Sequence, residues 1–93
     1  MRILIVEDEP DMVLKLKDNF EFESYEVLTA SDGQAGLDRA RTAKPDLVIL
    51  DWNLPMLTGA ELVRMVRSPR TFPWPDVPII MLTVHSERWR VIQ

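Results

Sequence analysis

Acidic side chains stand at the ends of two apolar segments of the chain. Glu7 and Asp8 come directly after Ile3–Val6, and Asp51 ends the apolar run of residues 47–50. A carboxylate is rarely buried without a partner, so Asp51 either caps a turn in solvent or faces a positive charge. Three neighbouring carboxylates cannot all stay ionised without a compensating cation. With no His or Cys nearby, oxygen ligands of this kind favour Mg²⁺ over zinc.

A magnesium site next to a carboxylate is suited to phosphoryl transfer. The metal neutralises charge on the oxygens of the transferring group, and a carboxylate beside it can accept that group as an acyl phosphate. Thr83 follows a later apolar run, and its hydroxyl could donate to a phosphoryl oxygen. The alternative is that each acid merely ends its strand as a turn residue. A role as a turn residue is the favoured interpretation for any one acid taken alone. It is not favoured when all of the acids lie at the same end of a sheet.

The elements that must position these residues alternate between strands and helices. Short, partly β-branched apolar runs predict buried strands, and apolar residues at three- and four-residue spacing predict helices. The predicted strands are residues 3–6, 25–30, 47–50 and 77–82. The predicted helices begin at Pro10, near Gln34 and at Thr58, with a fourth over Glu87–Gln93.

Each predicted helix has an apolar or small-residue face that should contact the sheet. In the first helix this face is Met12, Val13, Leu16 and Phe20. In the second it is Gly36, Leu37 and Ala40, whose small members would permit close packing, and in the third it is Leu62, Val63 and Val66. Residues 68–78 contain four of the seven prolines and predict an extended loop, in which Trp74 is interpreted as an anchor.

This alternation predicts one α/β domain over residues 1–93, with a doubly wound parallel sheet and helices on both faces. Strands that are apolar on both faces are typical of such sheets. Ligands bind beyond the carboxyl ends of the strands, where the strand order reverses. The acids and Thr83 all follow strands, so we expect them at this end.

Composition excludes several other classes of protein. The chain has 93 residues, 46% hydrophobic and 28% charged, with a net charge of −4. The acidic balance argues against nucleic acid or an acidic membrane surface as a partner. The absence of cysteine excludes disulfides and thiolate chemistry, and no segment predicts a membrane span or signal peptide. We therefore expect a cytoplasmic protein of bacterial type.

Three segments resemble the receiver domain of bacterial two-component response regulators. They are ILIVEDEP, DLVILDWNLPMLTGAELVRMVR and VPIIMLT. The shared motifs are an acidic pair after the first strand, D-x-x-x-P-x-x-x-G after the third and Thr after the fourth, and the resemblance covers nearly the whole chain. It implies a flavodoxin-like fold with strand order 2-1-3-4-5.

The resemblance also implies a role for each residue of the acidic site. Asp51 matches the phosphoacceptor, and Asp8 matches a direct Mg²⁺ ligand. Glu7 would hold a metal-bound water, while Asn53 would offer its backbone carbonyl to the metal. A sensor histidine kinase or a phosphotransfer protein would donate the phosphoryl group. Such a receiver controls an output by changing conformation and is not a conventional enzyme.

Three further residues match positions that shape or read the site. Thr83 matches the switch hydroxyl that turns toward the phosphoryl group. Pro55 and Gly59 match residues that shape the loop before the third helix.

The sequence departs from the family pattern at its end. It stops at Gln93, before the fifth strand and the Lys-Pro dipeptide whose lysine pairs with the acceptor carboxylate. None of Lys15, Lys17 and Lys44 matches that lysine. We therefore expect a fragment, incomplete at its C-terminus. Without a fifth strand, residues 77–82 would form an exposed edge that can pair with another chain, so a homodimer is possible.

Two other functions remain open at this point. A pseudo-receiver would keep the fold and bind a partner without being phosphorylated. A Mg²⁺-dependent phosphatase with an Asp nucleophile usually has a second acid two residues later, where this chain has Asn53. Labelling by acetyl phosphate would separate the first two functions, and turnover of a phosphate ester would support the third.

Overall fold

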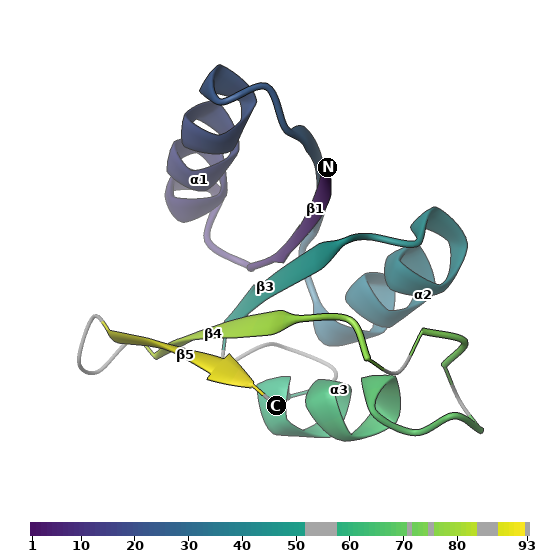
Figure 1. Ribbon diagram of the computed structural model, residues 1–93. Helices are drawn as coiled ribbons and strands as arrows, with labels where there is room; N and C mark the ends of the chain where they lie inside the picture. Colours follow the sequence, from purple (N-terminus) through teal and green to yellow (C-terminus); the bar gives the residue numbers. More distant parts are fainter. Residues whose placement is uncertain (52–57, 71, 75, 84–87, 93) are drawn as a thin grey trace.

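The computed structural model contains five strands and three helices in its described residues, in the order β1-α1-β2-α2-β3-α3-β4-β5 (Figure 1). The structure describes residues 1–51, 58–70, 72–74, 76–83 and 88–92. The strands are β1 (Arg2–Val6), β2 (Glu26–Ala30), β3 (Leu47–Asp51), β4 (Ile79–Thr83) and β5 (Arg88–Ile92). The helices are α1 (Pro10–Phe22), α2 (Gly33–Ala43) and α3 (Gly59–Val66).

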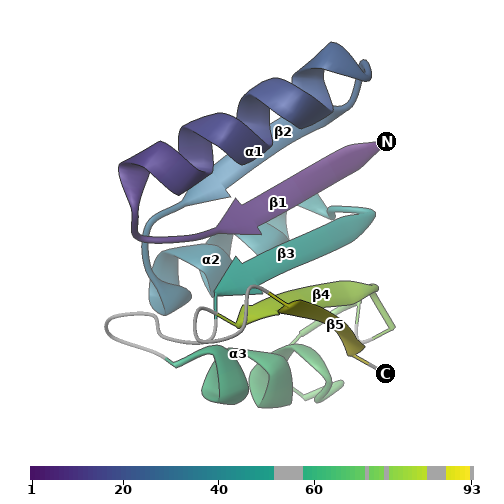
Figure 2. The same ribbon diagram turned by 90° about the vertical axis from the view of Figure 1, so that its left-hand side faces the viewer.

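The strands form one sheet in the order β2-β1-β3-β4-β5. Strands β1 to β4 are parallel, which confirms the predicted order 2-1-3-4. Val6 pairs with both Ala30 and Leu50, and Asp51 pairs with Leu82. The carboxyl ends of the four parallel strands therefore meet at one edge of the sheet, as the arrowheads in Figure 2 show.

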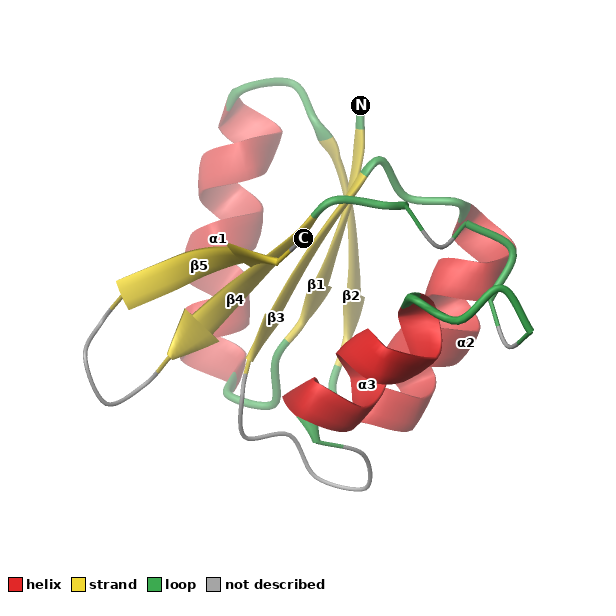
Figure 3. Ribbon diagram, turned by 60° about the horizontal axis from the view of Figure 1, so that its bottom comes forward, coloured by secondary structure: helices red, strands yellow, loops and turns green. Residues whose placement is uncertain are grey.

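Helices cover both faces of the sheet, as the sequence predicts. Figure 3 shows α1 on one face and the pair α2 and α3 on the other. Leu37 of α2 and Leu62 of α3 belong to the larger apolar cluster, which also contains Leu4 and Leu50. Leu16 and Phe20 of α1 pack against the second cluster, formed by Ile3, Ile5 and Ile49.

Two of the three helices begin at residues whose side chains satisfy free backbone amides. The side chain of Asp32 accepts a hydrogen bond of 2.7 Å from the amide of Ala35 at the start of α2. Thr58 and Glu61 form a reciprocal capping box at the start of α3. Pro10 lies in the first turn of α1, where its missing amide hydrogen removes no helical bond.

Helix α2 packs closely on the sheet through Gly36. A Cβ atom at this position would lie 2.8 Å from both methyl carbons of Val6. Gly36, Leu37 and Ala40 are all buried, which confirms the predicted inner face of α2. The absence of a side chain at Gly36 therefore allows α2 to approach β1, whose next residue is Glu7.

The predicted inner face of α1 is only partly correct. Leu16 and Phe20 contact the sheet, but Met12 is 41% exposed. The first turn of α1 lies beyond the carboxyl end of β1, where there is no strand beneath it (Figure 2). Apolar contact with the sheet consequently begins one turn later than the spacing predicts.

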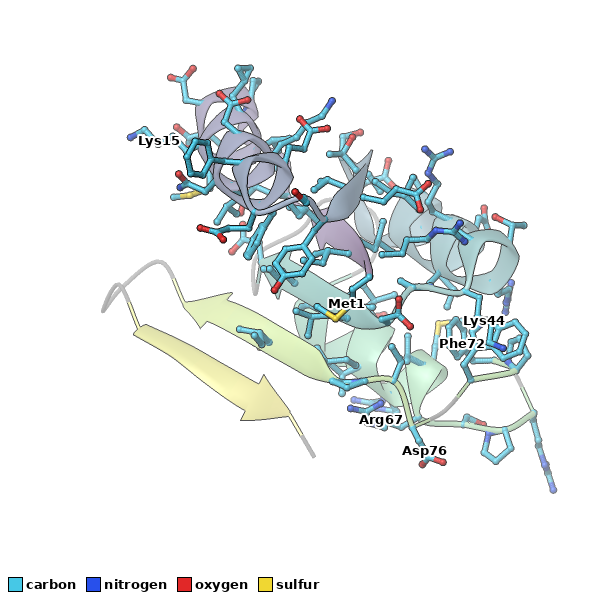
Figure 4. The ribbon with its side chains drawn as sticks, turned by 45° about the horizontal axis from the view of Figure 1, so that its top comes forward. Met1, Lys15, Lys44, Arg67, Phe72 and Asp76 are labelled. Carbon is cyan, nitrogen blue, oxygen red and sulfur yellow. The ribbon has the colours of Figure 1, made fainter. Side chains whose placement is uncertain are left out.

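The proline-rich loop between α3 and β4 is fixed by its aromatic residues. Phe72 is 1% exposed, and Trp74 packs against the larger core cluster. The indole Nε1 of Trp74 donates a hydrogen bond of 3.2 Å to the carbonyl of Ala40, and the ammonium of Lys44 lies 4.8 Å from the ring centre. Figure 4 shows Lys44 beside Phe72 at this end of α2. The interpretation of Trp74 as a loop anchor is confirmed.

The prediction of a fourth helix over residues 87–93 is wrong. Arg88–Ile92 forms β5, which is antiparallel to β4 and pairs Thr83 with Arg88 and Ile79 with Ile92. The prediction that the fourth strand is an unpaired edge is wrong for the same reason. An edge strand presents free backbone groups, and a segment rich in β-branched and aromatic residues can satisfy them. Because β5 is antiparallel, it differs from the parallel fifth strand that the resemblance implies.

Candidate functional site

Three acids meet at the edge formed by the carboxyl ends of the strands. Val6 and Leu50 are paired across β1 and β3, so the residues that follow them, Glu7 and Asp51, are neighbours. One carboxylate oxygen from each of Glu7, Asp8 and Asp51 lies within 4.8 Å of the other two. The structure therefore brings together the acids that the sequence places after two separate strands.

Two of these acids are buried. Asp51 is 3% exposed and Glu7 is 7% exposed, whereas Asp8 lies at the surface. The amide of Glu9 donates a hydrogen bond of 3.1 Å to Oε1 of Glu7, and the amide of Glu7 donates one of 3.0 Å to the carbonyl of Ala30. The backbone of Glu7 is thus held by β2, and its side chain is held by the turn after β1.

The environment of Glu7 favours its neutral form. The pKa of this carboxyl is raised from 4.5 to about 7, and burial is the largest cause. The hydrogen bond from the Glu9 amide lowers the pKa, while the charges of Asp51 and Asp8 and a hydrogen bond with Asp8 contribute to the rise. The cluster therefore holds more negative charge than its surroundings stabilise, and a bound cation would relieve this excess.

The donor set fits Mg²⁺. All three side chains offer carboxylate oxygens, the ligands that this hard cation prefers. Two oxygens that bind one Mg²⁺ directly lie at most about 4.2 Å apart, since each bond is about 2.1 Å long. A spread of up to 4.8 Å therefore suits a site in which some acids bind the ion directly and others bind it through water. No other group of three or more His, Cys, Asp or Glu side chains is placed this way among the described residues.

The other residues named from the sequence are placed less completely. Thr83 is the last residue of β4, one position after Leu82, which pairs with Asp51. The backbone therefore brings Thr83 to the same edge of the sheet. Gly59 is the first residue of α3. Asn53 and Pro55 lie outside the described residues.

A pocket of about 310 Å³ adjoins the acids and was not predicted from the sequence. Glu7 and Asp8 form part of its lining, together with Val13 and Leu14 of α1. The one sequence signal for it is Leu14, a large apolar residue outside the predicted inner face of α1. An apolar wall of this kind, beside charged groups, is typical of a binding surface.

The comparison with protein families decides what kind of domain this is. Residues 3–93 match the family model of the response regulator receiver domain. The chain belongs to this family. It is the receiver domain of a two-component response regulator, and its acidic cluster of Glu7, Asp8 and Asp51 fits a phosphoacceptor site. Receiver domains of response regulators in general have a histidine kinase as partner and are generally not conventional enzymes.

Two curated relatives cover almost all of this receiver. The alkaline phosphatase synthesis transcriptional regulatory protein PhoP of Bacillus subtilis is 42% identical over 88 residues, which are 95% of this chain and 35% of that protein. The response regulator ArlR of Staphylococcus aureus is 40% identical over 88 residues, 95% of this chain and 38% of that protein. The receiver thus spans little more than a third of the length of these relatives.

Solved structures confirm the receiver fold. Chemotaxis response regulator CheY4 of Vibrio cholerae matches with a TM-score of 0.83 and 34% identity, over 91% of this chain and 69% of that one. The receiver domain of sensor histidine kinase PA1611 from Pseudomonas aeruginosa matches with a TM-score of 0.83 and 29% identity, over 91% and 68%. That second structure has a magnesium ion coordinated in its active site cleft. In the described part of this receiver, no helix has the length and apolar character needed to cross a bilayer.

Proposed function

We propose that this receiver accepts a phosphoryl group on Asp51 from a histidine kinase or a phosphotransfer protein. The observation that supports this role is the convergence of three carboxylates within 4.8 Å at the carboxyl ends of β1 and β3. Asp51 is 3% exposed, the least exposed of the three acids, and it ends β3, the central strand of the sheet. It is therefore the best placed of the three to act as the nucleophile.

In the proposed transfer, a carboxylate oxygen of Asp51 attacks the phosphorus atom of the phosphohistidine. A new oxygen–phosphorus bond forms as the phosphorus–nitrogen bond breaks, and the imidazole nitrogen of the donor keeps that electron pair. Mg²⁺, when bound, neutralises charge on the phosphoryl oxygens. Asp8 would bind the metal directly, Glu7 would bind it through water, and Asn53 would contribute its backbone carbonyl.

The same proposal assigns roles to the residues around the acids. The hydroxyl of Thr83 donates to a phosphoryl oxygen and reports phosphorylation by its change of position. Pro55 and Gly59 shape the segment between Asp51 and α3. The resulting change of conformation controls an output, as the names of the longer regulatory relatives suggest.

Intact mass spectrometry after incubation with acetyl phosphate and Mg²⁺ tests the proposal. The wild-type protein should gain the mass of one phosphoryl group, and Asp51→Asn should gain none, because the amide keeps the shape of the side chain without its nucleophilic charge. Asp18→Asn, at an exposed acid of α1, is the matched control and should label like the wild type. Equal labelling of Asp51→Asn would refute the assignment, and a wild type that does not label would favour the pseudo-receiver. Steady release of phosphate from a phosphate ester would instead favour the phosphatase.

A further inference from the structure

Asp32 and Gly33 form the junction at which α2 begins. Asp32 is the N-cap of the helix, and Gly33 is its first residue. They are the one Asp-Gly pair in the sequence. The backbone nitrogen after an aspartate can attack the side-chain carboxyl, and glycine favours this reaction because it has no side chain to hinder it and restricts the backbone least. Among the aspartates of the chain, Asp32 therefore has the neighbour that most favours closure of a five-membered succinimide ring.

The folded structure holds this pair away from the reactive geometry. Oδ1 of Asp32 accepts a hydrogen bond of 2.7 Å from the amide of Ala35. Asp32 has a ψ of 170°, whereas ring closure needs its Cβ and the nitrogen of Gly33 nearly eclipsed about the Cα–C bond. Rotation about that bond would move the carbonyl of Asp32, which accepts a hydrogen bond of 2.9 Å from the amide of Gly36. The ring can therefore close only when the first turn of α2 opens.

We propose that Asp32 is a modification site, at which aspartate converts to isoaspartate each time an opening of this turn allows a succinimide to form. The nitrogen of Gly33 attacks Cγ of the protonated carboxyl and forms a nitrogen–carbon bond. The carbon–oxygen bond breaks, and the hydroxyl leaves with the amide proton as water. A water molecule then adds to the main-chain carbonyl of the ring and breaks its bond to the nitrogen. The chain now runs through Cγ, with no net change in mass.

The product loses the cap of α2. An isoaspartate has an additional methylene in the main chain and carries its free carboxylate on Cα, so it cannot keep the bond to the Ala35 amide in the same backbone path. Loss of an N-cap destabilises a helix. Helix α2 packs on Val6 through Gly36, and this contact depends on the same first turn. The isomerised protein should therefore unfold at a lower urea concentration than the unmodified protein.

Incubation in mildly acidic buffer, which supplies the protonated carboxyl, tests the proposal. Isoaspartate at residue 32 is quantified by peptide mapping with electron-transfer fragmentation, and it should form at least about tenfold more slowly in the folded protein than in urea. In urea, where the fold has no influence, Gly33→Ala should slow its formation about tenfold.

Two substitutions at Ala35 separate the cap from other effects. In the folded protein, Ala35→Pro removes the amide hydrogen that binds Asp32 and should speed the conversion about fivefold. Ala35 is exposed, and Ala35→Ser keeps the amide and is the matched control. Urea below the unfolding transition gives a second test that needs no variant, because it favours opening of the turn and should raise the rate.

Four results would overturn the inference. They are no isoaspartate at residue 32 in the wild type, equal rates in the folded and urea-unfolded protein, equal rates in Ala35→Pro and Ala35→Ser, and a rate that does not rise in urea below the transition. Labelling of Asp51 by acetyl phosphate does not involve this pair, so the outcome is independent of the proposed function.

Discussion

Replacing Glu7 with glutamine should stabilise the protein at alkaline pH. The glutamine resembles the neutral form of Glu7 and can still accept the hydrogen bond from the Glu9 amide. The pKa of Glu7 is raised from 4.5 to about 7, mainly by burial and also by the charges of Asp51 and Asp8. Because the folded-state pKa is the higher one, Glu7 contributes stability that is fully present below pH 4.5 and is lost as the pH rises to about 7. The wild type loses this stability as the pH rises, and Glu7→Gln, which has no carboxyl group at this position, does not.

The size of the effect follows from the two pKa values. The difference between 4.5 and about 7 corresponds to about 3 kcal/mol at full ionisation. Part of this loss has already occurred at pH 5, where Glu7 is largely ionised in the unfolded chain. Integrated from pH 5 to pH 8, the free energy of unfolding of Glu7→Gln should therefore rise relative to wild type by about 2 kcal/mol.

Urea unfolding in a metal-free buffer at pH 5 and pH 8 measures this difference. Glu9→Gln removes an exposed carboxylate two residues away and is the matched control, for which we expect a change below about 0.5 kcal/mol. If the stability difference between Glu7→Gln and wild type were the same at both pH values, Glu7 would not be a destabilised buried acid. The electrostatic account of the site would then be wrong.

The remaining predictions concern the metal and the packing behind it. Asp8→Ala should raise the Mg²⁺ concentration at the midpoint of a tryptophan-fluorescence titration by about tenfold or more, while Glu9→Ala should change it little. The expected reporter is Trp52, which follows Asp51 in the sequence. An unchanged midpoint in Asp8→Ala would place the metal elsewhere. Gly36→Val should lower the free energy of unfolding by about 2 kcal/mol, because its side chain would overlap β1. Ala35→Val, at an exposed position of the same helix, controls for helix propensity, and equal losses in the two variants would contradict the close approach.

The parts of the fold that could be predicted are those with a strong local pattern. Apolar runs as long as one strand define β1 and β3, and the spacing of Leu37 and Ala40 defines the buried face of α2. The acids of the site could also be predicted, because carboxyl ends of parallel strands must meet at one edge. The pairing of Val6 with Leu50 between β1 and β3 then makes the next residues, Glu7 and Asp51, neighbours.

The parts that could not be predicted depend on contacts between distant segments. The sequence of Arg88–Ile92 is compatible with either a helix or a strand, and its pairing with β4 decides for the strand. Met12 fits the helical spacing of the inner face, but the position of the first turn of α1 relative to β1 exposes it. The pocket beside Leu14 requires the arrangement of α1 against the end of β2, which no local pattern contains.

The repulsion within the acidic cluster and its affinity for cations have the same physical origin. Glu7 and Asp51 are buried beside each other, so each ionised carboxylate raises the free energy of the other. A cation that binds only the folded state lowers this repulsion, and its binding free energy adds to the free energy of unfolding, by about 2.7 kcal/mol at a hundred times its dissociation constant. Removing the charge of Glu7 would therefore have two effects. It would raise the free energy of unfolding in the absence of a cation, and it would weaken the binding of a cation. The same buried carboxylates therefore lower the free energy of unfolding when no cation is bound and raise the affinity of the site for a cation.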